Sequence, residues 1–304
     1  MAGSARDDEH ILAVVLVGYI IVAHSLPEHL VRLVRRLQSP RARFFVHIDR
    51  GAPSVVMQTV AEQLGEVENV RLLPRHRVGW ARFSQVEATL EGIAAILDAP
   101  EPIDYGVLLT GQDYPLRPPR VVEQTLLDAS GRSFLEHWPA TGRWRTRVDR
   151  WHWHGTVLGR RLRLPNRFVP ISVRRPVPGG LAPFAGRTHW CLSRECLQYV
   201  AGFVARRPDV VREFRWRSHP DEAFFHTILM NSPLAGTIVN DDLRYVDWSD
   251  NQPSPRTLTT ADLDRMLASN DLFARKFDPR VDARVLDLLD DHLAAPAAAQ
   301  SGRA

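Results

Sequence analysis

Short apolar runs alternate with amphipathic segments along the first 115 residues of the chain. The apolar runs are VGYIIVAH (17–24), RFFVHID (43–49), VRLL (70–73) and YGVLLTG (105–111). Runs of this length and composition are typical of buried strands. Strands that alternate with helices favour a mostly parallel sheet flanked by helices, so the sequence predicts an α/β fold.

Two of the intervening segments carry helix signals. LPEHLVRLVRRL has Pro27 near its start and places apolar residues on one face and arginines on the other. FSQVEATLEGIAAIL begins with Ser84 and Glu87, the Ser-x-x-Glu pattern of a capping box, and continues with apolar residues at helical spacing. We therefore expect a helix at each segment, with Ser84 capping the second.

Residues 138–187 interrupt this regularity. The segment is rich in tryptophan and arginine and has too few regularly spaced aliphatic residues for a core of its own. It predicts a loop-rich insertion over the edge of the sheet rather than a second domain. We expect a single domain over residues 10–295, with residues 1–9 and 296–304 as disordered tails.

Regular patterns return after the insertion. They predict a strand in THWCLS with a helix from Ser193, a helix after Ser218, a short strand in LRYVDW, a helix capped by Thr259 or Thr260, and a last helix ending near Leu293. The apolar run at residues 11–23 is too short to span a bilayer and is read as strand.

Composition limits the compartment and the partners. The formal net charge is +4, and the arginines are spread along the chain, so duplex nucleic acid is a weak candidate partner and an anionic small molecule fits equally well. Cys191 and Cys196 are the only cysteines, too few for a disulfide framework. We expect a cytoplasmic protein with at most peripheral association with the inner face of the membrane, and no nucleic-acid partner.

Polar residues follow the predicted strands. His24, Asp49 and the GQDYP turn that contains Asp113 each come at the end of an apolar run. Ligands of open α/β sheets bind beyond the carboxyl ends of the strands, so these residues predict a binding site at one rim.

The segment SHPDEAFFHTIL carries a candidate general base. Ser218 and Asp221 fit a Ser-x-x-Asp capping box, which leaves Glu222 as an additional carboxylate. Glu222 is either a complement to the helix dipole or a base that takes a proton from an incoming hydroxyl.

Three cations in the last quarter of the chain are candidate ligands for a diphosphate. Arg244 lies in a short apolar strand, where Asp247 is an alternative partner, and Arg275 precedes Lys276 in LFARKFD. Lys276 is the only lysine of the chain. It is either a product of an arginine-rich composition or a position that needs a compact ammonium.

Metal and nucleotide-loop motifs are weak. Asp262-x-Asp264 falls in the first turns of an expected helix, where acids complement the dipole. His152-x-His154 has no convincing third ligand. There is no GxxxxGK[ST] loop and no GxGxxG after the first strand. We expect no bound metal.

Nine segments, taken in order, resemble the core-2/I-branching glycosyltransferase family, which includes the peptide O-xylosyltransferases. They are YIIVAHSLPEHLVRLVRRL, RFFVHIDR, GWARFSQVEATL, LLTGQDYPL, SFLEHW, THWCLSRECLQYV, SHPDEAFFHTILMNS, LRYVDW and LFARKFD. The resemblance covers most of residues 17–293. It implies a GT-A-type fold and inverting, metal-independent transfer from a UDP-sugar, with no cofactor.

The resemblance also implies residue roles. It makes Glu222 the catalytic base, and Arg244 and Lys276 contacts to the UDP diphosphate. FARKF is similar to the xylosyltransferase version, which adds Arg275 to these contacts. Where xylosyltransferases place an acid before the tryptophan of the HW strand, this chain has His189. His189 is therefore a second candidate base.

The remaining roles concern the two ends of the substrate site. Asp49 and the backbone near His24 correspond to the nucleoside end, and Asp113 in the neighbouring turn is grouped with them. Glu136 in FLEHW resembles an acceptor-contacting glutamate, and Trp190 is placed with it on the acceptor side.

We therefore expect a glycosyltransferase that uses UDP-N-acetylglucosamine as preferred donor and a hydroxyl of a glycan or other acceptor. UDP-xylose is the alternative donor. A catalytically inactive carbohydrate-binding protein on the same fold is the alternative class, because tryptophans and arginines suit sugar polymers. RNA binding comes last, and would show as salt-sensitive affinity.

Overall fold

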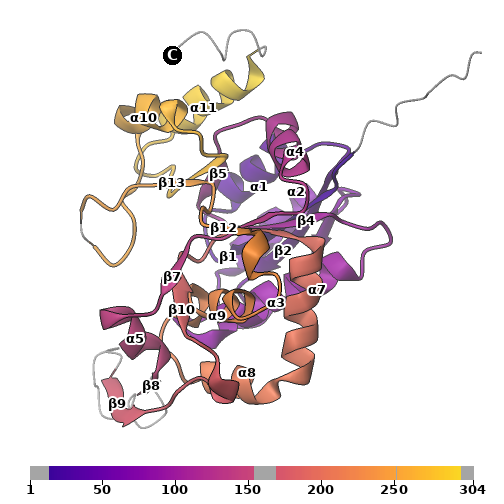
Figure 1. Cartoon of the computed structure of the whole chain (residues 1–304). Coiled ribbons are helices and arrows are strands. Elements are labelled where there is room, and N and C mark those ends of the chain that lie inside the picture. The colour runs from indigo at the N-terminus through magenta and orange to yellow at the C-terminus, as the bar shows by residue number, and fades with distance from the viewer. Residues whose placement is uncertain (1–13, 154–168, 251, 296–304) are drawn as a thin grey trace, which may run out of the picture.

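The computed structural model describes residues 14–153, 169–250 and 252–295, and a seven-stranded sheet forms its centre (Figure 1). The strands in spatial order are β12 (Ile238–Val239), β6 (Ser133–Phe134), β11 (Cys191–Ser193), β4 (Tyr105–Thr110), β1 (Val17–Ala23), β2 (Ala42–Ile48) and β3 (Val70–Leu72). Only β11 runs antiparallel to its neighbours, β4 and β6. The predicted mostly parallel α/β fold is confirmed.

The central strand β1 explains why the sheet is covered on both faces. Its alternate residues Val17, Tyr19 and Ile21 belong to one buried apolar cluster and Ile20 to another. A strand buried on both faces reads as a continuous apolar run, which is the pattern of this segment. Glycine is required at position 18, because a Cβ there would lie 2.9 Å from the side chain of Ile96 on the helix that covers the strand.

Helices supply the two layers. The first cluster contains residues of α1 (Pro27–Arg36), α2 (Ser54–Leu64), α4 (Pro119–Asp128), α10 (Leu263–Ala268) and α11 (Arg284–Ala294). The second contains residues of α3 (Phe83–Leu97), α7 (Arg194–Arg206), α8 (Pro208–Phe214) and α9 (Phe224–Met230). Over the ranges that the structure describes, none of the helices has the length and apolar character needed to cross a membrane.

A small sheet beside the main one joins three distant segments. β14 (Phe273–Arg275) pairs in parallel with β13 (Arg244–Val246) and antiparallel with β5 (Asp113–Pro115). This register places Arg275 opposite both Asp113 and Val246. The strand predicted in LRYVDW is confirmed, and Arg275 lies at the end of β14, a strand that the sequence did not predict.

The predicted insertion contains more regular structure than its sequence indicated. β7 (His137–Pro139) pairs with β10 (Phe184–Gly186), α5 (Gly142–Val148) follows β7, and β8 (Arg150–Trp153) pairs with β9 (Val169–Arg174). Its buried residues Val148 and Ala185 join the cluster of α3 and α7. In Figure 1, α5, β8 and β9 lie at the opposite end of the molecule from α10 and α11. His154 and the two predicted tails lie outside the described residues.

Two of the predicted helix caps are wrong. Ser84 lies inside α3 and accepts a hydrogen bond from the backbone N–H of Gly79 at 2.8 Å, while Glu87 pairs with Arg215 at 2.8 Å. Ser218 bonds the ring of its neighbour His219 at 2.7 Å. Both serines therefore bond other local groups in place of the expected cap.

Side chains cap two other helix starts, and the second of these caps confirms a prediction. Ser193 accepts from the backbone N–H of Cys196 at the start of α7. Thr259 and Asp262 form a capping box at η4 (Thr260–Asp262), the 3-10 turn that precedes α10. Asp262 is also bound by Arg256 at 2.5 Å and Arg265 at 2.6 Å, so the Asp-x-Asp pattern has a structural explanation.

Candidate active site

A cavity of about 1060 Å³ opens beyond the carboxyl ends of β1, β2 and β4. Residues that directly follow these strands form part of its wall, as expected for an open α/β sheet. Seven of the predicted site residues line it: His24, Asp49, Glu136, His189, Glu222, Arg275 and Lys276. Asp113, Trp190 and Arg244 do not.

Glu222 ends η2 (Pro220–Glu222), a 3-10 turn that begins at His219. Its Oε2 accepts a hydrogen bond from Nη1 of Arg147 at 2.5 Å, and 24% of its side chain is exposed. Burial and the adjacent Asp221 raise the pKa of Glu222 from 4.5 to about 8, against the opposing effect of Arg147. A carboxyl that titrates near neutral pH is suited to accept a proton from a substrate.

Asp221 is the neighbour that disfavours ionisation of Glu222. Its Oδ2 accepts from the hydroxyl of Thr188 at 3.0 Å, not from a helix N-terminus as its position in the sequence predicted. Burial also raises the pKa of Asp221. Two adjacent, largely buried carboxyls do not both ionise readily, which adds to the effect of burial on the pKa of Glu222.

The insertion supplies functional residues that sequence reasoning missed. Arg147 lies on α5, and its guanidinium carbon lies 4.6 Å from the ring centroid of Trp144. Trp144 in turn meets Trp138 edge to face at 5.1 Å. All three line the cavity. An arginine as such is not distinctive in a chain with 38 of them. Only the spacing Trp-x-x-Arg in the sequence could have indicated that Arg147 belongs to the site.

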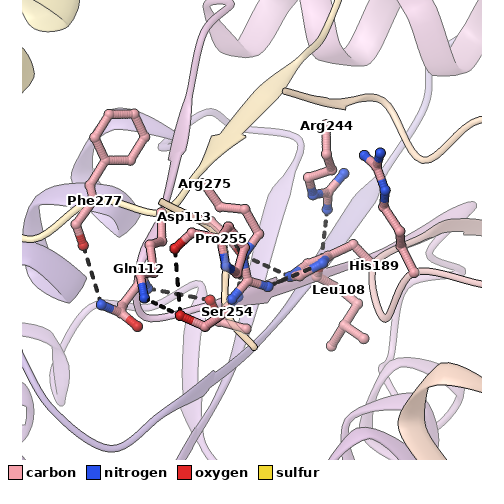
Figure 2. Close-up of polar contacts among 12 residues, drawn as sticks. Leu108, Gln112, Asp113, His189, Arg244, Ser254, Pro255, Arg275 and Phe277 are labelled. Carbon is pink, nitrogen blue, oxygen red and sulfur yellow. Dashed lines mark hydrogen bonds and ion pairs between the residues drawn. The ribbon is translucent and has the colours of Figure 1, made fainter. Parts of the chain in front are cut away.

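Arg275, His189 and Asp113 form a largely buried cluster in another part of the cavity wall (Figure 2). Nη1 of Arg275 lies 2.6 Å from Nε2 of His189, which lies 3.3 Å from Oδ2 of Asp113. Nε of Arg275 lies 3.7 Å from Oδ1 of Asp113. Asp113 therefore lies behind the cavity wall and orients the two residues that form it.

The charges of this cluster are fixed at neutral pH. Burial lowers the pKa of His189 to about 4, which outweighs the effect of Asp113. Burial would raise the pKa of Asp113, but the charge of Arg275 beside it holds this pKa below its usual range. His189 is thus a neutral imidazole whose ring nitrogen accepts from Arg275, an arrangement poorly suited to a general base.

Lys276 lines the cavity beside Arg275. Its Nζ donates to the hydroxyl of Ser254 at 2.5 Å, and Ser254 and Pro255 belong to the same wall. Burial and the charge of Arg275 lower the pKa of Lys276. Two adjacent cations therefore border one wall of the cavity.

Arg244 has a different place from the one expected. It is buried and donates to the backbone carbonyls of Leu108 at 2.7 Å and Asp242 at 2.8 Å. Its guanidinium carbon lies 4.6 Å from the ring centroid of Phe273. Asp247, the alternative partner, pairs instead with Arg256. Arg244 consequently joins β4 to the small sheet, and a direct phosphate contact does not fit this geometry.

Trp190 is also displaced from its predicted role. It is fully buried and packs against Phe225 with ring centroids 5.8 Å apart. Because it is part of the core, it is not positioned to touch an acceptor. Glu136 does line the cavity, where it pairs with Arg187 at 2.6 Å.

Asp49, predicted to lie at the nucleoside end of the site, is held by backbone hydrogen bonds. Its Oδ1 accepts from the backbone N–H groups of Gly51 at 2.8 Å and Val78 at 3.0 Å. These bonds fix the carboxylate at the carboxyl end of β2. His24, which follows β1, is exposed in the same cavity.

The chain matches the family Core-2/I-Branching enzyme over residues 17–269. It belongs to this family, and by that membership it is a glycosyltransferase.

Individual relatives are distant but cover most of the chain. Human beta-1,3-galactosyl-O-glycosyl-glycoprotein beta-1,6-N-acetylglucosaminyltransferase 3 is 25% identical over 91% of this chain and 68% of its own length. Mouse xylosyltransferase 2 is 26% identical over 92% of this chain, and Arabidopsis thaliana beta-glucuronosyltransferase GlcAT14A is 29% identical over 86%. The match spans 34% of the xylosyltransferase and 60% of the glucuronosyltransferase.

Proposed function

We propose that this glycosyltransferase moves a sugar, preferably N-acetylglucosamine, from a UDP-sugar to a hydroxyl of a glycan or other acceptor. The reaction is a single inverting displacement on a GT-A-type fold and uses no divalent metal. One observation carries the proposal: a carboxyl with a raised pKa, Glu222, shares a cavity with the adjacent cations Arg275 and Lys276.

Glu222 is the base of this mechanism. The acceptor oxygen attacks the anomeric carbon as its proton passes to the carboxylate of Glu222, and the bond between that carbon and the UDP oxygen breaks. Arg147 supports the ionised form of Glu222 by its hydrogen bond at 2.5 Å. Trp138 and Trp144 line the same cavity, and aromatic side chains are suited to contact an acceptor sugar.

Arg275 and Lys276 bind the diphosphate that leaves. Negative charge grows on the UDP oxygens as the sugar departs, and charge-assisted hydrogen bonds from fixed cations stabilise it where it develops. Arg244 and Asp113 act behind them as positioning residues, since both are buried and bonded to the segments that carry the site. His189 holds Arg275 in place and does not act as the base.

The donor end lies at the rim formed by His24 and Asp49. Names of relatives support two donors, because one is an N-acetylglucosaminyltransferase and another a xylosyltransferase. UDP-xylose is therefore the second candidate. The buried free thiols of Cys191 and Cys196 suit the proposed cytoplasmic location.

A panel of UDP-sugars tests the proposal through UDP release, with acceptor glycans and without added Mg²⁺ or Mn²⁺. We expect release with UDP-N-acetylglucosamine that added metal does not increase. Stabilisation by UDP without turnover would indicate the inactive carbohydrate-binding alternative. No stabilisation and no release with any UDP-sugar would contradict the proposal.

A further inference from the structure

Three side chains that commonly bind metals meet outside the cavity. His47 lies on β2, His76 in the segment after β3, and Glu91 on α3. One ligand atom from each lies within 4.8 Å of the other two. None of the three lines the cavity, so the proposed transfer reaction does not use them.

The distances match the spacing of ligands around one ion. Nε2 of His47 lies 3.3 Å from Nδ1 of His76, which lies 3.4 Å from Oε1 of Glu91. Tetrahedral ligands bound at about 2.0–2.1 Å are separated by about 3.3 Å. These two separations therefore correspond to two edges of a tetrahedral site.

The hydrogen bonds around the cluster leave Nδ1 of His76 as an acceptor. Nε2 of His76 lies 3.1 Å from the carbonyl oxygen of Ser84, which only accepts, so Nε2 carries the proton and Nδ1 presents a lone pair toward Oε1 of Glu91. A cation between these two acceptors would remove their repulsion. Nε2 of His47 accepts the backbone N–H of His76 at 3.3 Å and would exchange this bond for the same ion. A carbonyl that orients the second ring nitrogen is usual for a metal-bound histidine.

Two further atoms of these side chains, which are not the proposed ligand atoms, have no hydrogen-bond partner among the described residues. His47 is fully buried, and no group in the described part of the chain bonds its Nδ1. Oε2 of Glu91 is likewise without a hydrogen-bond partner among the described residues. The side chains of His76 and Glu91 are 27% and 40% exposed, so an ion and a water ligand have access from solvent.

We propose that His47, His76 and Glu91 bind a zinc ion, with water as the fourth ligand. Two imidazoles and one carboxylate suit zinc, whereas Mg²⁺ and Ca²⁺ favour oxygen ligands. The ion would join β2, residues 74–82 and α3. Val78 in that segment bonds Asp49 and lines the cavity, so the site braces the nucleoside wall without taking part in transfer.

The test compares wild type with Glu91→Gln and a matched control, Glu87→Gln. Glu87 lies one turn earlier on α3 and pairs with Arg215 at 2.8 Å, so its replacement removes the same charge from the same helix. Protein is stripped with EDTA and dialysed, and zinc binding is followed by elemental analysis and by melting temperature as ZnCl₂ is added. MgCl₂ serves as the comparison metal.

We expect a single zinc per chain in wild type and Glu87→Gln, with a higher melting temperature in zinc than in magnesium. Glu91→Gln should bind zinc about 10-fold more weakly or worse. Equal zinc affinity in the two variants, or no effect of zinc on the melting temperature of wild type, would overturn the proposal. The three side chains would then share a proton and bind no metal. His76→Gln gives the same readouts if Glu91→Gln fails to fold. These measurements do not depend on transfer activity.

Discussion

Two parts of the cavity wall are built in different ways. In one, strand register brings Arg275 to Asp113, and His189 completes a buried cluster. In the other, a 3-10 turn carries Glu222 and a helix of the insertion carries Arg147, with both side chains partly exposed. The first part holds its charges fixed, while the second has a carboxyl whose charge changes near neutral pH. Fixed positive charges suit the binding of a diphosphate, and a carboxyl that titrates near neutral pH suits the acceptance of one proton.

The largest effect is expected in the proton-accepting part of the wall. Glu222→Gln should slow transfer by about 100- to 10,000-fold, because a positioned base contributes that much, while UDP still binds. Turnover by UDP release and UDP binding by calorimetry measure the two effects. Glu195→Gln, an exposed acid in the first turn of α7, is the control. Near-normal turnover in Glu222→Gln would move the base elsewhere.

The next largest effect is expected in the anion-binding part of the wall. Lys276→Ala should slow turnover about 100- to 1000-fold, since it removes a fixed charge where the leaving group develops its own. Lys276→Arg should restore only part of the rate, because a guanidinium fork does not reproduce a compact ammonium. Arg280→Gln removes a nearby exposed charge that pairs with Asp278 and should leave the rate unchanged.

A variant of His189 distinguishes a positioning role for this residue from a role as the catalytic base. His189→Gln should slow turnover by about 10- to 100-fold, because Arg275 loses its buried partner and shifts. The ascending limb of the pH profile should stay in place, since Glu222 still supplies the titration. If the limb disappears and the loss equals that of Glu222→Gln, His189 is the base.

Arg147 should determine the pH at which activity rises in the ascending limb of the pH profile. Activity requires ionised Glu222, so kcat/KM should rise with pH through the raised pKa of about 8. Arg147 favours the ionised form, and Arg147→Gln should therefore move the limb to higher pH and cut activity several-fold near neutrality. Arg145→Gln on the same helix, where Arg145 pairs with Asp149 at 3.3 Å, should leave the limb unmoved.

The smallest effect is on stability. Between pH 4.5 and about 8 the folded protein retains a proton on Glu222 that the unfolded chain has lost, so this group makes stability fall as pH rises through that window. Glu222→Gln removes the dependence. Its melting temperature relative to wild type should increase across the window, and a constant difference would show that the pKa of Glu222 is not raised.

Local patterns made much of the fold predictable. The strands at β1, β2, β3 and β4 followed from continuous apolar runs, and the rim residues His24 and Asp49 followed from the rule for parallel sheets. The three-residue strands β5 and β14 could not be predicted from local patterns, because their pairing joins segments more than 150 residues apart.

The site was predictable only in part, for the same reason. Lys276 and Glu222 were found from short motifs, and both line the cavity. Arg244 was expected there as well, but backbone carbonyls of distant segments bind its guanidinium behind the wall. Arg147 was missed because its role depends on how α5 folds back to Glu222, a contact across 75 positions of sequence.

Calorimetric titration of UDP into wild type and Lys276→Ala, with and without MnCl₂, tests most directly whether protein cations do the work of a divalent ion. We predict that UDP binds wild type equally well in both buffers and binds Lys276→Ala at least about 10-fold more weakly in both, as expected for a lost charge-assisted contact. Binding that requires Mn²⁺, or equal affinity in the two proteins, would contradict the account.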